Sequence, residues 1–264
     1  MAVYAELICV GNELLTGKVV NTNASWLAEK ATGLGVEVRR IEVVGDDLGE
    51  ISDAIRLALG RKPSFIITTG GLGPTYDDMT LAGVARAIGV ELEVNEKALE
   101  MVRRKYESMS LELTPARIKM ANLPKGGTAI ANPAGTAPGC LVEFAGTKIV
   151  SLPGVPSEMQ AIFAQSVAPM LEAAAGGMVF KEASIVLQGI PESALAPILD
   201  EVRKRNLPAY FKSHPKMSEG VPLIEVHVSA KEASGDKAER IVRKGVLDLK
   251  EAAILHGAKI LGER

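Results

Sequence analysis

The sequence predicts an α/β protein with a mostly parallel sheet, followed by a small α+β domain. Through the first 174 residues, short β-branched runs alternate with amphipathic helical segments. This alternation is typical of an open, largely parallel sheet. A tract of small residues, AAAGG at 173–177, then interrupts the pattern. We therefore expect a first domain at residues 1–174 and a second at residues 178–264.

The elements of the first domain follow from these patterns in order. A strand at Val3–Val10 leads to a helix at Thr22–Leu34, which ends at the stop signal Gly35. The short apolar run Ser64–Thr69 has the character of a strand buried on both faces. A glycine-rich loop joins it to a helix at Thr80–Ile88. The further strands and helices are expected at Val36–Val44, Ile51–Leu59, Glu96–Ser108, Pro115–Met120, Lys148–Leu152 and Ser157–Ala174.

The second domain is expected to alternate strand and helix. Its strands are predicted at Glu182–Gln188 and Pro222–Ala230, and its helices at Glu192–Asn206 and Asp236–Leu255. The GXXG loop with which KH domains clamp an RNA backbone does not occur after residue 175. The formal net charge is −2, which does not favour neutralisation of nucleic-acid phosphates. We therefore expect no nucleic-acid partner.

Other features concern compartment and assembly. No apolar run reaches the roughly 18 residues of a membrane span. The start, MAVYAELICVGNE, lacks the basic region and cleavage site of a signal peptide. Cys9 and Cys140 both lie in apolar, strand-like contexts and are expected to be buried, reduced thiols. We expect a cytoplasmic protein without a membrane partner, and an exposed sheet edge plus a second domain predicts a homodimer or other homo-oligomer.

The segment TTGGLGPTYDDMT at 68–80 is the strongest candidate for a binding loop. Its glycines, Gly70, Gly71 and Gly73, let an anion approach the main chain, and N–H groups at a helix start bind anions. Asp77 and Asp78 would repel a bare phosphate, but Mg²⁺ is usually held by carboxylates together with phosphate oxygens. The loop is predicted to hold a metal-bound phosphate or pyrophosphate. The alternative is a tight turn in which one aspartate caps the next helix.

Three further loops of similar character follow strands. Capping of the first helix explains one of its two asparagines, Asn21 and Asn23. Ligands of open α/β sheets bind at the carboxyl ends of the strands, so we expect the loops to form one site. Their candidate positions are Glu13, Asn21, Asn23, Asn132, Thr136, Pro153, Gly154 and Glu158.

Two familiar phosphate motifs fit the sequence poorly. The segment GNELLTGKV at 11–19 is not a P-loop, because five residues separate its glycines instead of four. Val19 also stands where a Ser or Thr must bind the metal. The first strand is not followed by GxGxxG, so the dinucleotide-binding Rossmann interpretation is weak.

Four ordered motifs resemble the competence-damage-inducible protein family (CinA): GNELLTGKVVNTNASWLA, TTGGLGPTYDDMT, NPAGTAPG and LPGVPSEM. The resemblance covers about residues 3–174 and implies a three-layer, molybdopterin-binding-like fold. Beyond about residue 175 it implies a small KH-like linker domain. The GGxGxxxxDxT signature of the wider group is matched by Gly70, Gly71, Gly73, Asp78 and Thr80.

The resemblance implies a pyrophosphatase that cleaves ADP-ribose, FAD or a similar dinucleotide with a divalent metal. On this hypothesis Asp78 and Asp77 ligate Mg²⁺ or another divalent ion, which polarises the phosphates and lowers the pKa of an attacking water. The amides of Gly71 and Gly73 stabilise phosphoryl charge. Glu13, which matches the GNE/GDE glutamate of the group, orients water, acts as general base or is a second metal ligand. The ribose, base or distal phosphate is positioned by Asn21, Asn23, Asn132 and Thr136.

Two other functions stay open. One is a pterin-binding protein of the molybdenum-cofactor biosynthesis type, and the other is a nucleotide-binding protein without catalysis. Molybdopterin-binding members often carry an aspartate where this chain has Asn21, which argues against pterin chemistry and leaves nucleotide chemistry untouched. The long form of the family adds a deamidase domain. The sequence stops at Arg264, before that domain would start, so no deamidase activity is expected.

Overall fold

The computed structural model of the chain describes residues 3–218 and 221–263. It divides into two compact units near residue 175. The N-terminal unit carries a six-stranded sheet, and the C-terminal unit carries a four-stranded one. Within the described residues, no helix is both long enough and apolar enough to cross a membrane.

The N-terminal sheet is mostly parallel, as predicted, with the strand order β2-β1-β3-β8-β7-β6. The first four of these strands are parallel neighbours, whereas β7 and β6 run antiparallel at one side. The buried strand β3 lies at the centre between β1 and β8. The strands of this six-stranded sheet are β1 (Tyr4–Val10), β2 (Glu37–Val44), β3 (Phe65–Thr69), β6 (Thr128–Ile130), β7 (Gly139–Phe144) and β8 (Thr147–Leu152).

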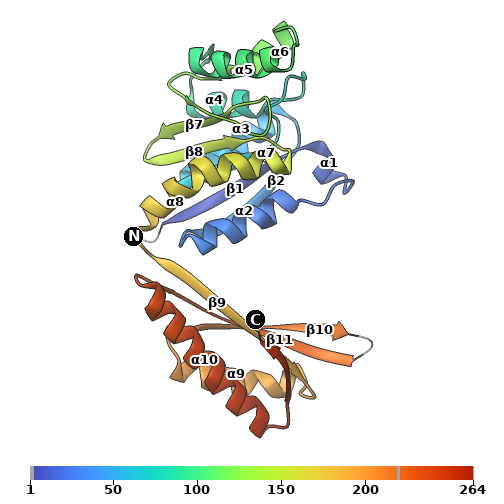
Figure 1. Cartoon of the computed structure of the whole chain (residues 1–264), viewed down its shortest axis with the longest axis vertical. Coiled ribbons are helices and arrows are strands. Elements are labelled where there is room, and N and C mark those ends of the chain that lie inside the picture. The colour runs from blue at the N-terminus through green and yellow to red at the C-terminus, as the bar shows by residue number, and fades with distance from the viewer. Residues whose placement is uncertain (1–2, 219–220, 264) are drawn as a thin grey trace. The chain divides into compact units, whose positions relative to one another are not determined.

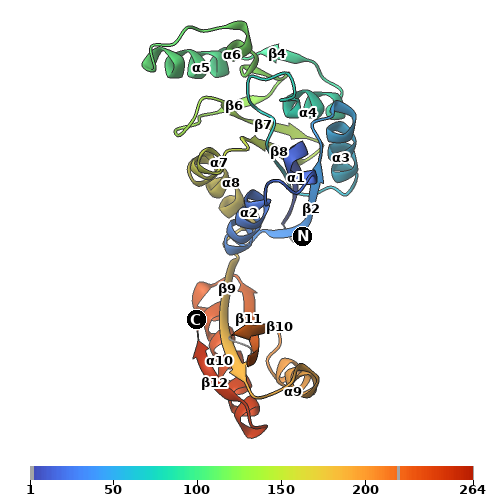
Figure 2. The ribbon, with the colours of Figure 1, turned by 90° about the vertical axis from the view of Figure 1, so that its right-hand side faces the viewer.

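Helices cover both faces of this sheet and make a three-layer unit (Figures 1 and 2). On one side lie α2 (Thr22–Gly33), α7 (Pro156–Ile162) and α8 (Ala168–Ala175), and on the other α3 (Leu48–Gly60) and α4 (Thr80–Ile88). Ile51 and Ile55 of α3 share one apolar core with Ile8 and Ile66 of the sheet. The predicted α/β fold class is thus confirmed.

The strand register brings the loops that follow β1, β3 and β8 to one edge of the sheet. Cys9 near the end of β1 pairs with Thr69 at the end of β3, and Thr69 pairs with Leu152 at the end of β8. The three strands therefore stop at one level of the sheet. Because they are parallel, the loops that follow them emerge together at the carboxyl edge, where α/β sheets bind ligands.

The helix expected at Ser157–Ala174 is interrupted. A π-helical segment, η1 (Phe163–Val167), separates α7 from α8, and the N–H of Ala168 donates to the carbonyl of Phe163. Pro169 supplies the physical reason, since it lacks an N–H for the ordinary helical bond at this point. The ring of Phe163 packs edge-on against Trp26 of α2, with centroids 5.1 Å apart.

A side excursion leaves the sheet between α4 and β6. Two short antiparallel strands, β4 (Leu92–Val94) and β5 (Asn122–Pro124), close its base. Between them lie α5 (Glu96–Ser108) and α6 (Pro115–Lys119). Asn95 caps α5 by accepting the N–H of Ala98, and Thr114 caps α6.

The C-terminal unit is a βαββαβ unit with an antiparallel sheet in the order β10-β11-β9-β12. This connectivity is that of ferredoxin-like domains. The KH-like character that the resemblance implied for this unit stays a prediction. The elements are β9 (Val179–Gln188), α9 (Glu192–Arg205), β10 (Tyr210–Ser218), β11 (Val221–Glu232), α10 (Gly235–Leu255) and β12 (Lys259–Glu263).

The sequence patterns did not predict the two edge strands of this sheet, β10 and β12. In the segment YFKSHPKMS of β10, Phe211 is buried, but Ser213 and Pro215 follow it on the same face, so the alternation of a half-buried strand is weak. One face of the sheet packs its aliphatic side chains on the helices, in one core with Val242 and Leu249 of α10.

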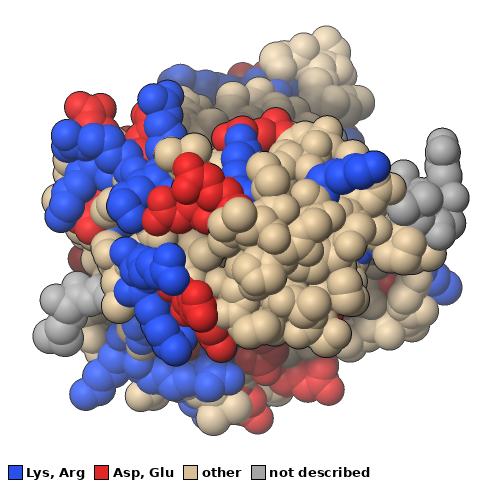
Figure 3. All heavy atoms as spheres, turned by 90° about the horizontal axis from the view of Figure 1, so that it is seen from below, with Lys and Arg blue, Asp and Glu red and all other residues tan. Residues whose placement is uncertain are grey.

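Figure 3 shows a face of this unit where Lys and Arg gather, with acidic side chains among them and an uncharged area beside them.

The other face of the sheet carries a charged cluster around Glu225, which is only 6% exposed. Glu225 forms an ion pair with Lys216 and accepts a hydrogen bond from Ser184 at 3.2 Å. His227 lies 3.4 Å from the same carboxylate and 3.0 Å from that of Glu182. The Lys216 ammonium, aided by His227 and Ser184, lowers the pKa of Glu225 to about 2 in spite of the opposing effect of burial.

This depressed pKa makes the stability of the C-terminal unit depend on pH. The contribution of Glu225 is present above the ordinary pKa of about 4.5 and is lost as the pH falls towards 2. Glu225→Gln should lower the free energy of unfolding at pH 7 by on the order of 1–3 kcal/mol. The deficit should shrink below about pH 4.5. Denaturant titrations at pH 7 and pH 3, with the exposed Glu251→Gln as control, measure it. A deficit that is equal at both pH values would contradict the assignment.

Candidate functional site

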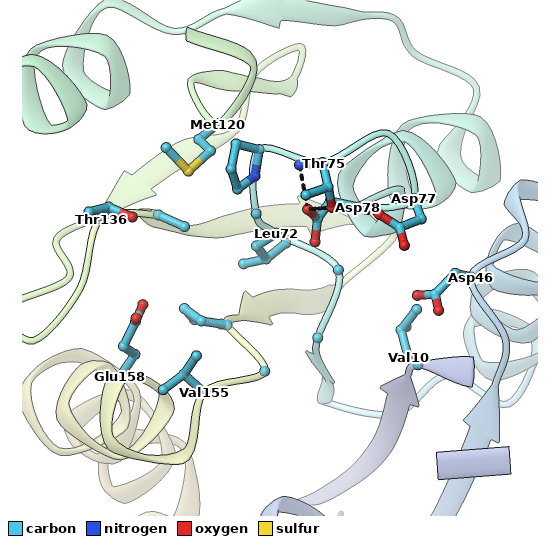
Figure 4. Close-up of a pocket in the computed structure, with 18 of the residues that line it drawn as sticks. Val10, Asp46, Leu72, Thr75, Asp77, Asp78, Met120, Thr136, Val155 and Glu158 are labelled. Carbon is cyan, nitrogen blue, oxygen red and sulfur yellow. Dashed lines mark hydrogen bonds between the residues drawn. The ribbon is translucent and has the colours of Figure 1, made fainter. Parts of the chain in front are cut away.

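A cleft of about 410 Å³ opens at the carboxyl edge of the N-terminal sheet. Figure 4 shows side chains reaching into it from the loops after β1, β2, β3 and β8, and from the loop between β6 and β7. It is lined by Val10, Gly11, Glu13, Asp46, Gly70, Gly71, Leu72, Gly73, Pro74, Thr75, Asp77, Asp78, Met120, Thr136, Ala137, Pro153, Gly154, Val155 and Glu158.

The loop after β3 can exist only with glycine at its start. Gly70 has φ of +105°, and a Cβ there would lie 2.1 Å from the carbonyl oxygen of Val10. Gly71 also has a positive φ, +64°. The buried hydroxyl of Thr80 donates to the carbonyl of Gly70 at 2.7 Å and fixes the loop on the first turn of α4. Glycine is required here because both the conformation and the space exclude a side chain.

Main-chain donors of this loop are left free. Among the residues that the structure describes, the N–H groups of Gly71, Leu72 and Gly73 have no protein acceptor. All three residues line the cleft. Consecutive unpaired N–H groups at a loop that leads into a helix form an anion-binding site.

The two aspartates hold the far side of the loop. Asp78 accepts the N–H of Thr75 at 2.8 Å and approaches its hydroxyl at 2.5 Å. Asp77 contacts the same hydroxyl, which has one proton and so donates to one carboxylate at a time. That contact and a backbone N–H, together with the charge of Lys119, lower the pKa of Asp77. Lys119 of α6 also donates to the carbonyl of Thr75.

The capping alternative for the aspartates is wrong. The N-cap of α4 is Met79, and no side chain makes a capping hydrogen bond there. Asp78 instead closes a short turn on Thr75. Its second oxygen makes no hydrogen bond to the described part of the chain, and Figure 4 shows Asp77 and Asp78 beside Thr75 at one end of the cleft.

An acidic residue that the sequence patterns did not reveal stands at the same end. Asp46 follows β2, and its carboxylate accepts the N–H of Asn12 at 2.8 Å, while the Asn12 side chain accepts the N–H of Asp46 at 3.3 Å. Asp47 beside it caps α3. The strand-end argument that selected Glu13 applies equally to Asp46, because β2 is parallel to β1. With Asp77, Asp78, Glu13 and Glu158, five carboxylates line the cleft, which has no Lys, Arg or His among its lining residues.

The opposite wall is built around Glu158 and Asn132. The amide of Asn132 donates to Glu158 Oε2 at 2.6 Å and to the carbonyl of Ala137 at 2.8 Å. Its Oδ1 accepts the N–H groups of Ala134 and Gly135, at 3.1 and 2.8 Å. The carboxylate of Glu158 lies directly against Gly135, so that a Cβ at position 135 would meet it within 2.3 Å.

Most of the predicted site residues line the cleft, but four do not. Thr80 and Asn132 hold loops from behind the wall. Asn21 accepts the N–H of Ala24 at 3.1 Å and so caps α2. Asn23 donates to the Thr69 hydroxyl at 3.1 Å and to the carbonyl of Gly154 at 2.8 Å. The predicted residues in the cleft are Glu13, Gly70, Gly71, Gly73, Asp77, Asp78, Thr136, Pro153, Gly154 and Glu158.

Asn21 and Asn23 line a smaller cavity of about 100 Å³ beside the main cleft. This cavity shares Glu13, Gly70 and Gly154 with the main cleft. The two asparagines thus lie beside the cleft, and their hydrogen bonds order the loops around it.

The fold and the cleft define a three-layer α/β protein with a loop of free N–H groups at the carboxyl edge of its sheet. A family model described as a probable molybdopterin-binding domain matches residues 6–173, and the chain belongs to this family. The crystal structure of CinA from Thermoplasma acidophilum, described as having unknown function, is 45% identical and covers 64% of this chain and 98% of its own, with a TM-score of 0.60. The predicted resemblance to CinA is confirmed.

Relatives extend over both units. A protein of Pyrobaculum arsenaticum is 51% identical over 242 residues, which is 91% of each chain. A protein of Aeropyrum pernix is 48% identical over 253 residues, or 93% of this chain and 94% of its own. Their names state no activity. The family description supports a pterin-type ligand over the dinucleotide pyrophosphatase that we expected first, and hydrolase activity stays a prediction.

The contact between Gly70 and Val10 should be intolerant of any side chain. Gly70→Ala places a Cβ against a backbone carbonyl at positive φ, and we expect a loss of more than about 2 kcal/mol in the free energy of unfolding. Gly60→Ala, at the end of α3 with nothing within 4 Å of the added Cβ, is the matched control. Denaturant unfolding of both variants measures the difference. Equal stabilities would show that the loop tolerates a rearrangement here.

Proposed function

We propose that the N-terminal unit binds a pterin of the molybdopterin type through a phosphate group on the glycine loop. The observation that carries the proposal is the run of free N–H groups at Gly71, Leu72 and Gly73, three residues that line a cleft of about 410 Å³ in a chain of this family. Such a cleft has the size of a site for a single small ligand.

The donors suit phosphate more than any other group the cleft can admit. Three successive main-chain N–H groups match the oxygens of one phosphate, and the positive end of the α4 dipole adds to their attraction. The absence of cationic side chains among the lining residues leaves these amides as the attractive surface for an anion. The carboxylates around them oppose a bare anion, so part of the ligand charge needs a counterion.

The cleft can hold a divalent cation only if the bound small molecule supplies some of the coordinating oxygens. Among residues 3–218 and 221–263, no three His, Cys, Asp or Glu side chains are arranged to hold a metal ion. Asp77 and Asp78 provide two adjacent carboxylates, and Mg²⁺ is commonly held by one or two carboxylates plus phosphate oxygens and water. We propose that these two aspartates hold the cation and that the ligand phosphate completes its coordination.

A second candidate function is the metal-dependent pyrophosphatase that the resemblance implied, acting on ADP-ribose, FAD or a similar compound. It is favoured by the acidic residues Asp46 and Glu13, which stand in the cleft with Asp77 and Asp78. A bound cation would lower the pKa of a water molecule near the phosphates. Glu13 would accept the proton of that water, and the free N–H groups would stabilise charge on the phosphoryl oxygens.

Binding of a phosphorylated pterin tests the first proposal. We expect 6-hydroxymethylpterin diphosphate to bind in calorimetry with Mg²⁺ at least about ten-fold more tightly than the same pterin without phosphate, because the N–H groups act on the phosphate. Inorganic pyrophosphate should compete. Gly73→Ala, whose Cβ would lie 2.6 Å from Asp78 Oδ2, should weaken binding, whereas Gly60→Ala should not. Equal affinity with and without phosphate would overturn the proposal.

Turnover tests the second candidate separately. ADP-ribose, FAD and NAD are each incubated with the protein and Mg²⁺, Mn²⁺ or Co²⁺, and the products are separated by chromatography. The hypothesis predicts metal-dependent release of AMP and its loss in Asp78→Asn, with little change in melting temperature. Asp53→Asn on the exposed face of α3 serves as control. Failure to release AMP in folded protein that binds pyrophosphate would leave a binding site without this chemistry.

A further inference from the structure

The wall of the cleft opposite the aspartates ends in a carboxylate whose position is fixed. Glu158 is half-buried, and its Oε2 accepts the amide of Asn132 at 2.6 Å. Asn132 is itself held by four hydrogen bonds to Glu158, Ala137, Ala134 and Gly135. An amide N–H donates, so Oε2 of Glu158 acts as an acceptor.

The second oxygen of this carboxylate remains free. Glu158 Oε1 has no donor in the described part of the chain, and Glu158 is one of the residues that line the cleft. Gly135 leaves room for the carboxylate, because any side chain there would overlap it. No Lys, Arg or His lines the cleft to neutralise Glu158, so a ligand group that reaches this wall must bring a hydrogen-bond donor or a cation.

We propose that Glu158 selects the ligand by its ring edge, accepting hydrogen bonds from the adjacent ring N–H and amino group of a 2-amino-4-oxo heterocycle. Pterin and guanine share this edge. Adenine presents a ring acceptor next to its amino group, and the lone pair of that acceptor repels a carboxylate. This specificity role rests on the proposed function, which places the phosphate of the same ligand on the glycine loop.

The alternative is that Glu158 only anchors the loop at 132–137 through Asn132. The two roles differ in what a Glu158→Gln substitution does. Glutamine can keep its carbonyl oxygen towards the Asn132 amide, and it then presents an N–H₂ group to the cleft. That group clashes with the donors of guanine or pterin, but it donates well to the ring acceptor of adenine. A purely structural role would weaken all ligands alike.

The test compares GDP, ADP and 6-hydroxymethylpterin diphosphate by calorimetry with Mg²⁺. In the wild-type protein we expect GDP to bind about ten-fold or more tightly than ADP, as for well-formed paired hydrogen bonds to a base edge. In Glu158→Gln the ratio should fall to about one or reverse. The pterin should follow GDP in both proteins, and whichever binds more tightly to the wild type identifies the preferred ring. Glu172→Gln on the exposed face of α8 is the matched control.

Each outcome has a separate meaning. If GDP and ADP bind equally to the wild type, or Glu158→Gln lowers both affinities by the same factor, the specificity role is overturned while the phosphate site stands. If none of the three diphosphates binds and inorganic pyrophosphate does not bind either, the proposed function fails first. Thermal melting of Glu158→Gln shows whether the variant is folded, and Glu158→Asp, which keeps the acceptor on a shorter arm, should retain the preference for GDP.

Discussion

The close packing of Gly70 on the carbonyl of Val10 is the contact on which the cleft depends. It lets the chain turn at the end of the central strand without a side chain that would separate β3 from β1. The hydroxyl of Thr80 and the amide of Asn23 then tie this turn to α4, to Thr69 and to the loop after β8. The free N–H groups of the loop stay free because these bonds use other atoms.

The charge of the cleft follows from its parallel strands. The segments that follow β1, β2, β3 and β8 each contribute an acidic residue, and cations are absent from the lining. A site of this kind attracts an anion only through main-chain dipoles or a bound cation, so recognition depends on geometry more than on net charge. The two ends also differ, since Asp77 and Asp78 adjoin the free amides whereas Glu158 faces them from across the cleft (Figure 4).

Much of the fold and of the candidate site could be predicted from the sequence, because local patterns determine the helices, strands and loops concerned. The span of α4 and the loop before it follow from an apolar run, three glycines and a helical period. Asp46 was not predicted, although it follows a parallel strand as Glu13 does. The two hydrogen bonds of the Asn23 amide could not be predicted either, because their acceptors are 46 and 131 residues away in the sequence. Edge strand β10 was missed because Ser213 and Pro215 follow the buried Phe211 on its inner face and obscure the period of two.

The excursion between β4 and β5 has a consequence for how such a domain diversifies. It is closed by its own strand pair, so changes of length or sequence inside it leave the hydrogen bonds of the large sheet intact. Lys119 nevertheless joins it to the carbonyl of Thr75, at the turn that carries both aspartates. Sequence changes at exposed positions of this segment can thereby reach the cleft through Lys119, while the hydrogen bonds of the large sheet stay the same.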